Sequence, residues 1–185
     1  EQLVEEAEYL VAGGIKELIL VAQETSLYGR DIYGEKKLPQ LLCKLCAIQG
    51  IEWIRILYCY PEEITDELIE TIKTEPKICH YIDMPIQHAS DNILKKMGRR
   101  TTNADLRKII SKLRTEIPDI ALRTTLITGF PGESDEDHNI LMDFIDEMEF
   151  DRLGVFTYSP EEDTPAASMP DQIDEEVKLD RRDEL

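Results

Sequence analysis

The sequence predicts an α/β fold with a mostly parallel sheet, and the prediction rests on the order of its segments and on the length of the chain. Along the 185 residues, segments with helical spacing of apolar side chains alternate with short apolar runs, giving five strands separated by helices. Strands that alternate with helices pair in parallel through right-handed crossovers. Because a closed eight-stranded barrel takes about 250 residues, we expect an open sheet or a partial barrel.

The first part of the chain predicts two helices around one strand. Residues 1–14 carry apolar side chains on one helical face and end at two glycines. Residues 15–22, IKELILVA, form a strand that is apolar enough to be buried on both faces. A polar loop over 27–37 leads to a helix over 38–48, whose leucines are expected to be buried.

The middle of the chain continues the alternation. Strands are expected at 53–58 and 81–86, and helices at 65–74, 91–97 and 103–116. Thr65 is a suitable N-cap for the helix it begins, because its hydroxyl can accept a hydrogen bond from the first turn. Pro118 ends the last of these helices.

Residues 123–134, RTTLITGFPGES, predict a strand, a glycine-rich turn and a helix start. Gly129 and Gly132 allow positive φ or the close approach of a ligand. Ser134 can cap the helix that continues to residue 148, and the acidic residues after it complement the helix dipole. The remaining elements are a strand over 152–158, an acidic loop over 160–172 and a charged helix over 173–185.

The charge balance is strongly acidic, with 39 acidic and 21 basic residues and a formal net charge of -18. Such a chain repels nucleic acid phosphates, so we expect no direct nucleic acid binding and a basic protein partner. Solubility alone is the simpler explanation of the same charge. No apolar run approaches the roughly 20 residues that span a membrane, and no signal peptide pattern opens the chain. A cytoplasmic protein without membrane contact is therefore expected.

The four cysteines are predicted to be reduced and structural. Cys43 and Cys46 form a C-x-x-C pair, but the pair lies within a predicted helix among leucines, and Cys59 and Cys79 fall in other units. We therefore expect buried cysteines that act as small apolar side chains, and no metal site.

Polar residues and glycines follow the predicted strands, where ligands bind in parallel sheets. They are Gln23, Glu24, Gln87, His88, Ser90, Gly129, Gly132, Ser159 and Glu161. Glu24 could accept hydrogen bonds from an amine or a ribose, or be a solvated loop carboxylate. Arg123 could bind a carboxylate, or form a structural ion pair. His88 is expected to be a hydrogen-bonded loop residue, and neither phosphate-binding fingerprints nor a nucleophile elbow are present.

Several segments resemble, in order and spacing, the radical S-adenosylmethionine (SAM) methylthiotransferases. They are AQETSLYGRDIYG, RILYCYPEEI, YIDMPIQHASDNILKKMGRR, RTTLITGFPGESDEDH and FDRLGVFTYSPEEDTPAA. The resemblance covers essentially the whole chain and implies a partial, open TIM-like (βα) barrel of the radical SAM type. It implies SAM bound at the strand ends, near a 4Fe-4S cluster.

The resemblance also implies a set of SAM-binding residues. By motif position, Gln23 and Glu24 would meet the methionine amino end, and Gln87 and Ser90 would line the next strand end. Arg123 and Thr125 would reach the carboxylate or ribose. The residues expected near the adenine or on the last strand are Ile127, Gly129, Phe156 and Tyr158. The resemblance assigns no catalytic residue.

One departure from the family is large. Its cluster cysteines, C-x-x-x-C-x-x-C, have no match here, so the 4Fe-4S clusters are expected to be ligated outside this chain. The chain also lacks an initial Met and ends in a helix without a cap. We therefore expect residues 1–185 to be a core fragment without the first strand, the cluster loop and the downstream domain, and to be inactive alone.

The implied function is the addition of a methylthio group to the β-carbon of an aspartate in small-subunit ribosomal protein twelve. The RTTLITGFPGE and YSPEEDTPA segments are similar to that branch of the family. In this chemistry a 5′-deoxyadenosyl radical formed from SAM abstracts the β-hydrogen. Two alternatives stay open: the branch that modifies tRNA adenosine, and a non-catalytic SAM-binding module.

Overall fold

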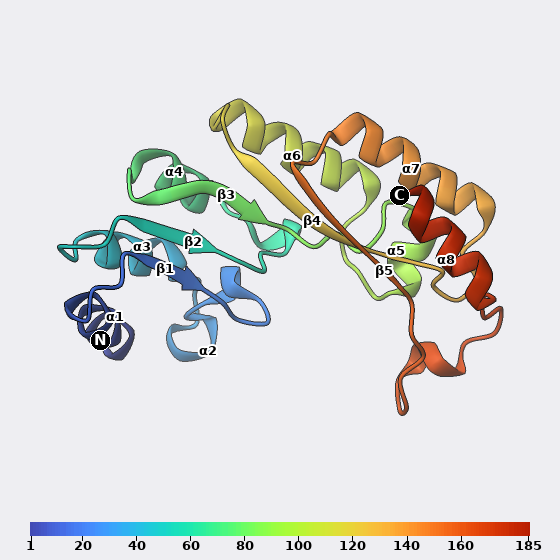
Figure 1. Ribbon diagram of the computed structural model, residues 1–185, viewed down its shortest axis with the longest axis horizontal. Helices are drawn as coiled ribbons and strands as arrows, with labels where there is room; N and C mark the ends of the chain where they lie inside the picture. The colour runs from blue at the N-terminus through green and yellow to red at the C-terminus, as the bar shows by residue number, and fades with distance from the viewer. The chain divides into compact units, whose positions relative to one another are not determined.

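The computed structural model describes residues 1–185 as two compact units (Figure 1). One unit comprises Glu1–Met84 and Ser111–Leu122, and the other Pro85–Ile110 and Arg123–Leu185. The strands are β1 (Glu17–Leu20), β2 (Trp53–Ile56), β3 (Ile78–Asp83), β4 (Ala121–Thr128) and β5 (Arg152–Thr157). The α-helices are α1 (Gln2–Ala12), α2 (Arg30–Tyr33), α3 (Leu38–Cys46), α4 (Asp66–Thr74), α5 (Asp91–Lys96), α6 (Asn103–Glu116), α7 (Asp135–Met148) and α8 (Glu175–Glu184). The predicted α/β class with five strands is confirmed.

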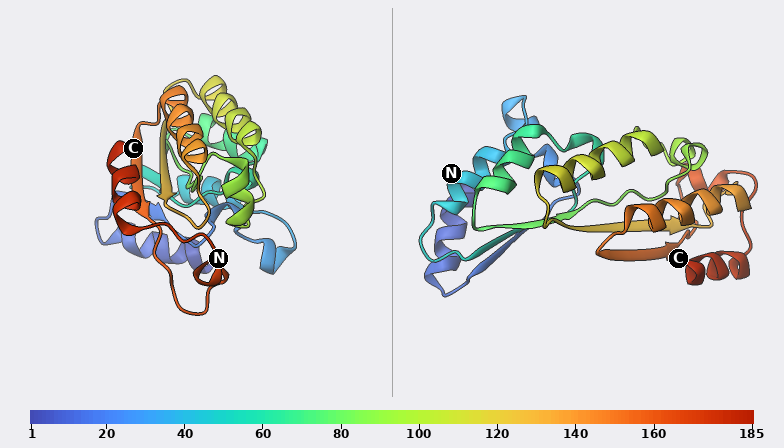
Figure 2. Two further views of the ribbon diagram at one scale, coloured as in Figure 1. Left: turned by 90° about the vertical axis from the view of Figure 1, so that its right-hand side faces the viewer. Right: turned by 90° about the horizontal axis from the view of Figure 1, so that it is seen from above.

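In the first unit, β1, β2 and β3 pair in parallel. On one sheet face Leu18, Ile54 and Ile56 are buried, and α3 and α4 pack on that side (Figure 2). The opposite face is open, because Ile19 of β1 is 54% exposed and Trp53 of β2 is 53% exposed. The prediction that residues 15–22 are buried on both faces was therefore wrong. Helices cover only one face of this strand.

In the second unit, β4 and β5 pair in parallel from Arg123 opposite Arg152 to Thr128 opposite Thr157. Side chains along β4 alternate strictly between buried and half-buried positions. The first turns of α6 contact α7 through the guanidinium of Arg107, which pairs with Glu147 and lies over the ring of Phe144. None of the helices combines the length and the apolar character needed to cross a membrane.

The two largest differences from the sequence-based elements concern β3 and the loop before α3. The strand expected at 81–86 is observed at Ile78–Asp83, and Pro85 explains its earlier end because proline has no N–H for a strand ladder. The loop expected at 27–37 contains the single-turn helix α2, bounded by Gly29 and Gly34, both with positive φ. Short 3-10 helices also occupy three connections: Thr25–Leu27, Pro61–Glu63 and Pro165–Ser168.

The helix caps are those the sequence predicts. The hydroxyl of Thr65 accepts the backbone N–H of Leu68 at the start of α4. At the start of α7, Ser134 and Asp137 form a reciprocal capping box, in which each side chain accepts the other residue's backbone N–H. Gly129 and Gly132 have φ of 72° and 75°, as the glycine-rich turn requires.

Candidate functional site

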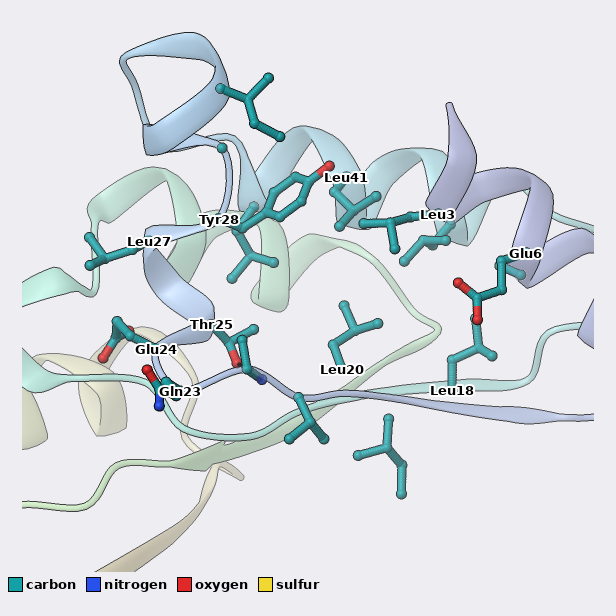
Figure 3. A pocket seen from close by; sticks show the side chains of 18 of the residues that line it. Leu3, Glu6, Leu18, Leu20, Gln23, Glu24, Thr25, Leu27, Tyr28 and Leu41 are labelled. Atoms are coloured by element: carbon teal, nitrogen blue, oxygen red, sulfur yellow. Dashed lines mark hydrogen bonds between the residues drawn. The ribbon is translucent and has the colours of Figure 1, made fainter.

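Gln23 and Glu24 lie in the first unit, just after β1, at one end of a cavity of about 1110 Å³ (Figure 3). Most of its wall is apolar: Leu18 and Leu20 come from β1, and Leu41 comes from α3. The two polar side chains lie together at that end, beside Thr25 (Figure 3). This cavity therefore offers an apolar body with a polar end, which is the usual composition of a small-molecule site.

Glu24 is held by backbone groups. Its Oε2 accepts the N–H of Tyr60 at 2.9 Å, and its Oε1 accepts the N–H of Ser26 at 3.0 Å. Burial raises the pKa of Glu24 above its ordinary value, although the hydrogen bonds from Ser26 and Tyr60 act in the opposite direction. The alternative of a solvated loop carboxylate was wrong. Glu24 ties the loop after β1 to the loop after β2.

Arg123, Thr125 and Ile127 lie in the second unit, on one face of β4. All three are half-buried, whereas Thr124, Leu126 and Thr128 on the other face are buried. Thr125 pairs with Gly154 of β5, and Ile127 pairs with Phe156, which is 60% exposed. We call the surface formed by Arg123, Thr125, Ile127, Gly154 and Phe156 the β4–β5 face.

Gln87 is fixed beside this face. Its N–H donates to the carbonyl of Thr125 at 3.0 Å, and its carbonyl accepts the N–H of Ile127 at 2.8 Å. Gln87 has φ of 70°, an uncommon value for a residue other than glycine. Two backbone hydrogen bonds to β4 therefore hold a left-handed residue next to the predicted SAM-binding positions, as is common at functional sites.

The other three predicted residues of this unit have different surroundings. Ser90 is 2% exposed and its hydroxyl bonds to the carboxylate of Asp137 on α7. Tyr158 follows β5 and packs edge-to-face on Phe130, with ring centroids 5.2 Å apart. Gly129 faces Lys178 of α8, whose Cγ would lie 2.3 Å from a β-carbon added there. Ser90 therefore lies off the β4–β5 face, and Gly129 and Tyr158 are packed beneath α8.

Sequence reasoning missed the buried charges next to this turn. Both carboxylate oxygens of Glu133 are used: Oε2 accepts the N–H of Gly129 at 2.7 Å, and Oε1 pairs with Arg181 at 3.1 Å. Burial would raise the pKa of Glu133, but the surrounding polar groups, which are His88, the Arg181 guanidinium and the backbone N–H of Gly129, lower it below its ordinary value. No local sequence pattern identifies Glu133 as part of a buried ion pair, because its partner Arg181 lies 48 residues further along the chain.

His88 is fully buried, where the sequence predicts a hydrogen-bonded loop residue. Its Nδ1 accepts the N–H of Ser90 at 2.9 Å, and its Nε2 lies 3.7 Å from Glu133. The hydrogen-bonding role of His88 is confirmed, and the residue belongs to the core of the second unit.

The cysteines do not form a ligand set. Cys46 is buried, as predicted, but Cys43 is exposed, so that part of the prediction was wrong. Cys43 directly follows the buried Leu42. Successive residues of a helix are rotated by about 100° around its axis, so the Cys43 side chain lies on the solvent side. Burial raises the pKa of Cys46 to about 11 and that of Cys59 to about 12. Both side chains therefore favour the protonated thiol, whereas iron binds the thiolate. No group of three or more potential metal ligands is present.

The chain resembles known proteins along its whole length. Residues 1–145 match the Radical SAM superfamily. The chain is 70% identical to a protein of Lachnoclostridium phytofermentans and 57% identical to one of Geobacter sulfurreducens, both described as ribosomal protein uS12 methylthiotransferase RimO. All 185 residues are covered in both comparisons, but only 42% and 41% of the relatives' own lengths.

Solved structures with the same fold are more distant in sequence. The radical SAM methyltransferase TsrM from Kitasatospora setae matches with a TM-score of 0.64 and 20% identity, over 83% of this chain and 30% of TsrM. The Elp3 protein of Methanocaldococcus infernus matches with a TM-score of 0.59 and 15% identity, over 90% of this chain and 43% of Elp3. At such identities the likeness concerns the fold alone, which is the predicted open, partial-barrel type.

Proposed function

Because the chain belongs to the Radical SAM superfamily, we propose that it forms the SAM-binding core of a methylthiotransferase that modifies an aspartate of ribosomal protein uS12. The observation that carries the proposal is 70% identity over all 185 residues to a protein described with that activity. The substrate is a ribosomal protein, so the proposed activity is cytoplasmic. The chain spans about two fifths of that relative, and the proposal concerns the whole protein.

The β4–β5 face offers groups that match the parts of SAM. Arg123 is a cation for the carboxylate, the hydroxyl of Thr125 suits a ribose oxygen, and Ile127 is an apolar contact for adenine. Phe156 adds an exposed aromatic ring. The pairing of Thr125 with Gly154 leaves a gap where other strand residues would place a side chain. These residues therefore fit the cofactor.

In the proposed function, the chain's own residues bind and orient the cofactor. Arg123 would hold the carboxylate by charge-assisted hydrogen bonds, and Gln87 would border the same site through its fixed position beside β4. Glu24, with both oxygens on backbone N–H groups, would set the shape of the loop after β1. Bound SAM supplies the radical and methyl chemistry.

The residues of this chain do not fit an iron–sulfur cluster. Its four cysteines lie at separate places and form no set of three ligands. We therefore assign the 4Fe-4S clusters of the proposed enzyme to residues outside these 185, and derive no step from them.

The experiment is a modification assay with the whole protein. Anaerobic incubation with SAM, reductant, inorganic sulfide as the sulfur source and purified ribosomal protein uS12 is expected to add a methylthio group to one aspartate, located by fragment-ion mass spectrometry. A parallel reaction with tRNA tests the other branch of the family. Modified tRNA with unmodified uS12 would replace the proposed substrate. SAM binding without modification of either would favour a binding module.

A further inference from the structure

Gly154 occupies the interior of β5, where glycine weakens a strand. Its φ is not positive, so the backbone does not need a glycine. A β-carbon added to Gly154 would lie 3.7 Å from Nη2 of Arg123, and 3.8 Å from both Oγ1 of Thr125 and Cε2 of Phe156. These distances are ordinary van der Waals contacts. Neither the backbone conformation nor crowding by the chain therefore explains the glycine.

The space above Gly154 has a definite chemical character. It is bordered by the guanidinium of Arg123, the hydroxyl of Thr125 and the ring of Phe156. Gly129, by contrast, is explained by the chain itself, because its φ is 72° and its β-carbon would lie 2.3 Å from Lys178. A glycine without a structural reason marks a place where a ligand approaches the backbone closely.

We propose that Gly154 is a positioning residue for SAM: its missing side chain leaves the space that the cofactor occupies between Arg123, Thr125 and Phe156. The inference rests on the proposed function and deepens it. It predicts that a side chain at this position excludes the ligand while the strand itself becomes more stable. A merely structural glycine would show the opposite effect on stability.

The test uses the whole protein and two substitutions, Gly154→Ala and Gly154→Val. Equilibrium dialysis with radiolabelled SAM gives the Kd, and urea unfolding gives the midpoint. We expect Gly154→Ala to raise the midpoint, because alanine has less backbone freedom to lose and fits without a clash. Gly154→Val should raise the Kd at least about tenfold, the effect of one or two misplaced methylene groups in a binding site.

Leu153→Val is the matched control. It places the same side chain in β5 next to Gly154, but on the opposite face, since Leu153 pairs with the buried Thr124. Its Kd should equal that of the wild type. If wild type binds SAM and both Gly154 variants bind equally well, the inference is overturned and the proposed function stands. A lower midpoint for Gly154→Ala would also overturn it. If the wild type binds no SAM, the proposed function itself fails.

Discussion

Arg181 of α8 and Glu133 form an ion pair of 3.1 Å in which both side chains are almost fully buried, with exposed fractions of 8% and 0%. The guanidinium also donates to the carbonyl oxygen of Glu133 and to the carboxylate of Asp135 at 2.7 Å. Because the other oxygen of Glu133 accepts the N–H of Gly129, the pair connects α8 to the turn that follows β4. The C-terminal helix therefore supports the end of the β4–β5 face.

Replacing Arg181 by leucine should lower the free energy of unfolding by about 3–5 kcal/mol, because Glu133 would remain buried without its cation. Urea unfolding of the 185-residue chain measures the change. Arg182→Leu is the control, since the Arg182 side chain is 40% exposed and pairs only with the adjacent Asp183. Equal losses of unfolding free energy in the two variants would show that the buried pair contributes no more to stability than the exposed one.

The stability of the second unit should depend on the ionisation of Asp137. Burial would raise its pKa, but hydrogen bonds from Ser90, Ser134 and Asn92 lower it from 3.8 to about 2. The charged form is therefore favoured by folding. Its contribution, about 2 kcal/mol, is complete above about pH 5 and disappears as the pH falls toward 2.

Asp137→Asn should consequently be less stable than the wild type at pH 7 by about 2 kcal/mol, with the difference shrinking as the pH falls from 5 to 2. Unfolding free energies measured by urea titration across this range test it. A difference that stays constant with pH would mean that the hydrogen bonds do not favour the ionised carboxylate.

Gly129→Ala should cost more stability than Gly98→Ala. Both glycines have positive φ, 72° and 71°, so both substitutions carry the same backbone penalty of about 1 kcal/mol. Only the alanine at position 129 would clash with a neighbour. Its β-carbon would lie 2.3 Å from Lys178 Cγ, whereas nothing lies within 4 Å of a β-carbon at Gly98. Thermal unfolding of both variants compares them, and an additional Lys178→Ala substitution should partly rescue the first. Equal melting temperatures would refute the clash.

The acidic loop after β5 should accelerate the encounter with a basic substrate. Glu161, Glu162 and Asp163 are all exposed, and carboxylates there would attract a cationic loop of uS12. Replacement by Gln, Gln and Asn in the whole protein should slow modification at low salt. The rates should converge at high salt, because the Debye length is only about 8 Å even at physiological ionic strength. Unchanged rates at both ionic strengths would leave the loop as a solvated surface.

Several features of the β4–β5 face follow from local sequence signals. The alternation of Arg123, Thr125 and Ile127 with buried neighbours follows from the two-residue period of a strand. The cap at Ser134 and the positive φ of Gly129 depend on residues within one turn. Such features need no knowledge of the tertiary fold.

Features that depend on distant partners could not be predicted. The burial of Glu133 requires Arg181, which reaches it only when α8 is in place. From its position after a predicted strand, Ser90 is expected to contact the cofactor, but its hydroxyl is bonded to Asp137 on α7, 47 residues away in sequence. The bounds of β3 could not be predicted for a similar reason. Met84 and Ile86 are fully buried although they lie beyond the end of the strand, so their apolar character does not mark strand residues.

The central claim is that SAM binds on the β4–β5 face, and its most direct test is the affinity of the whole protein for SAM when Arg123 is changed. Arg123→Ala should weaken binding by about 1–3 kcal/mol, as expected for the loss of one charge-assisted hydrogen bond. The control is Arg182→Ala, which removes a 40% exposed arginine of α8 that pairs with the adjacent Asp183, away from the β4–β5 face. Isothermal titration calorimetry should give a raised Kd for Arg123→Ala alone. Identical Kd values for wild type and Arg123→Ala would contradict the account.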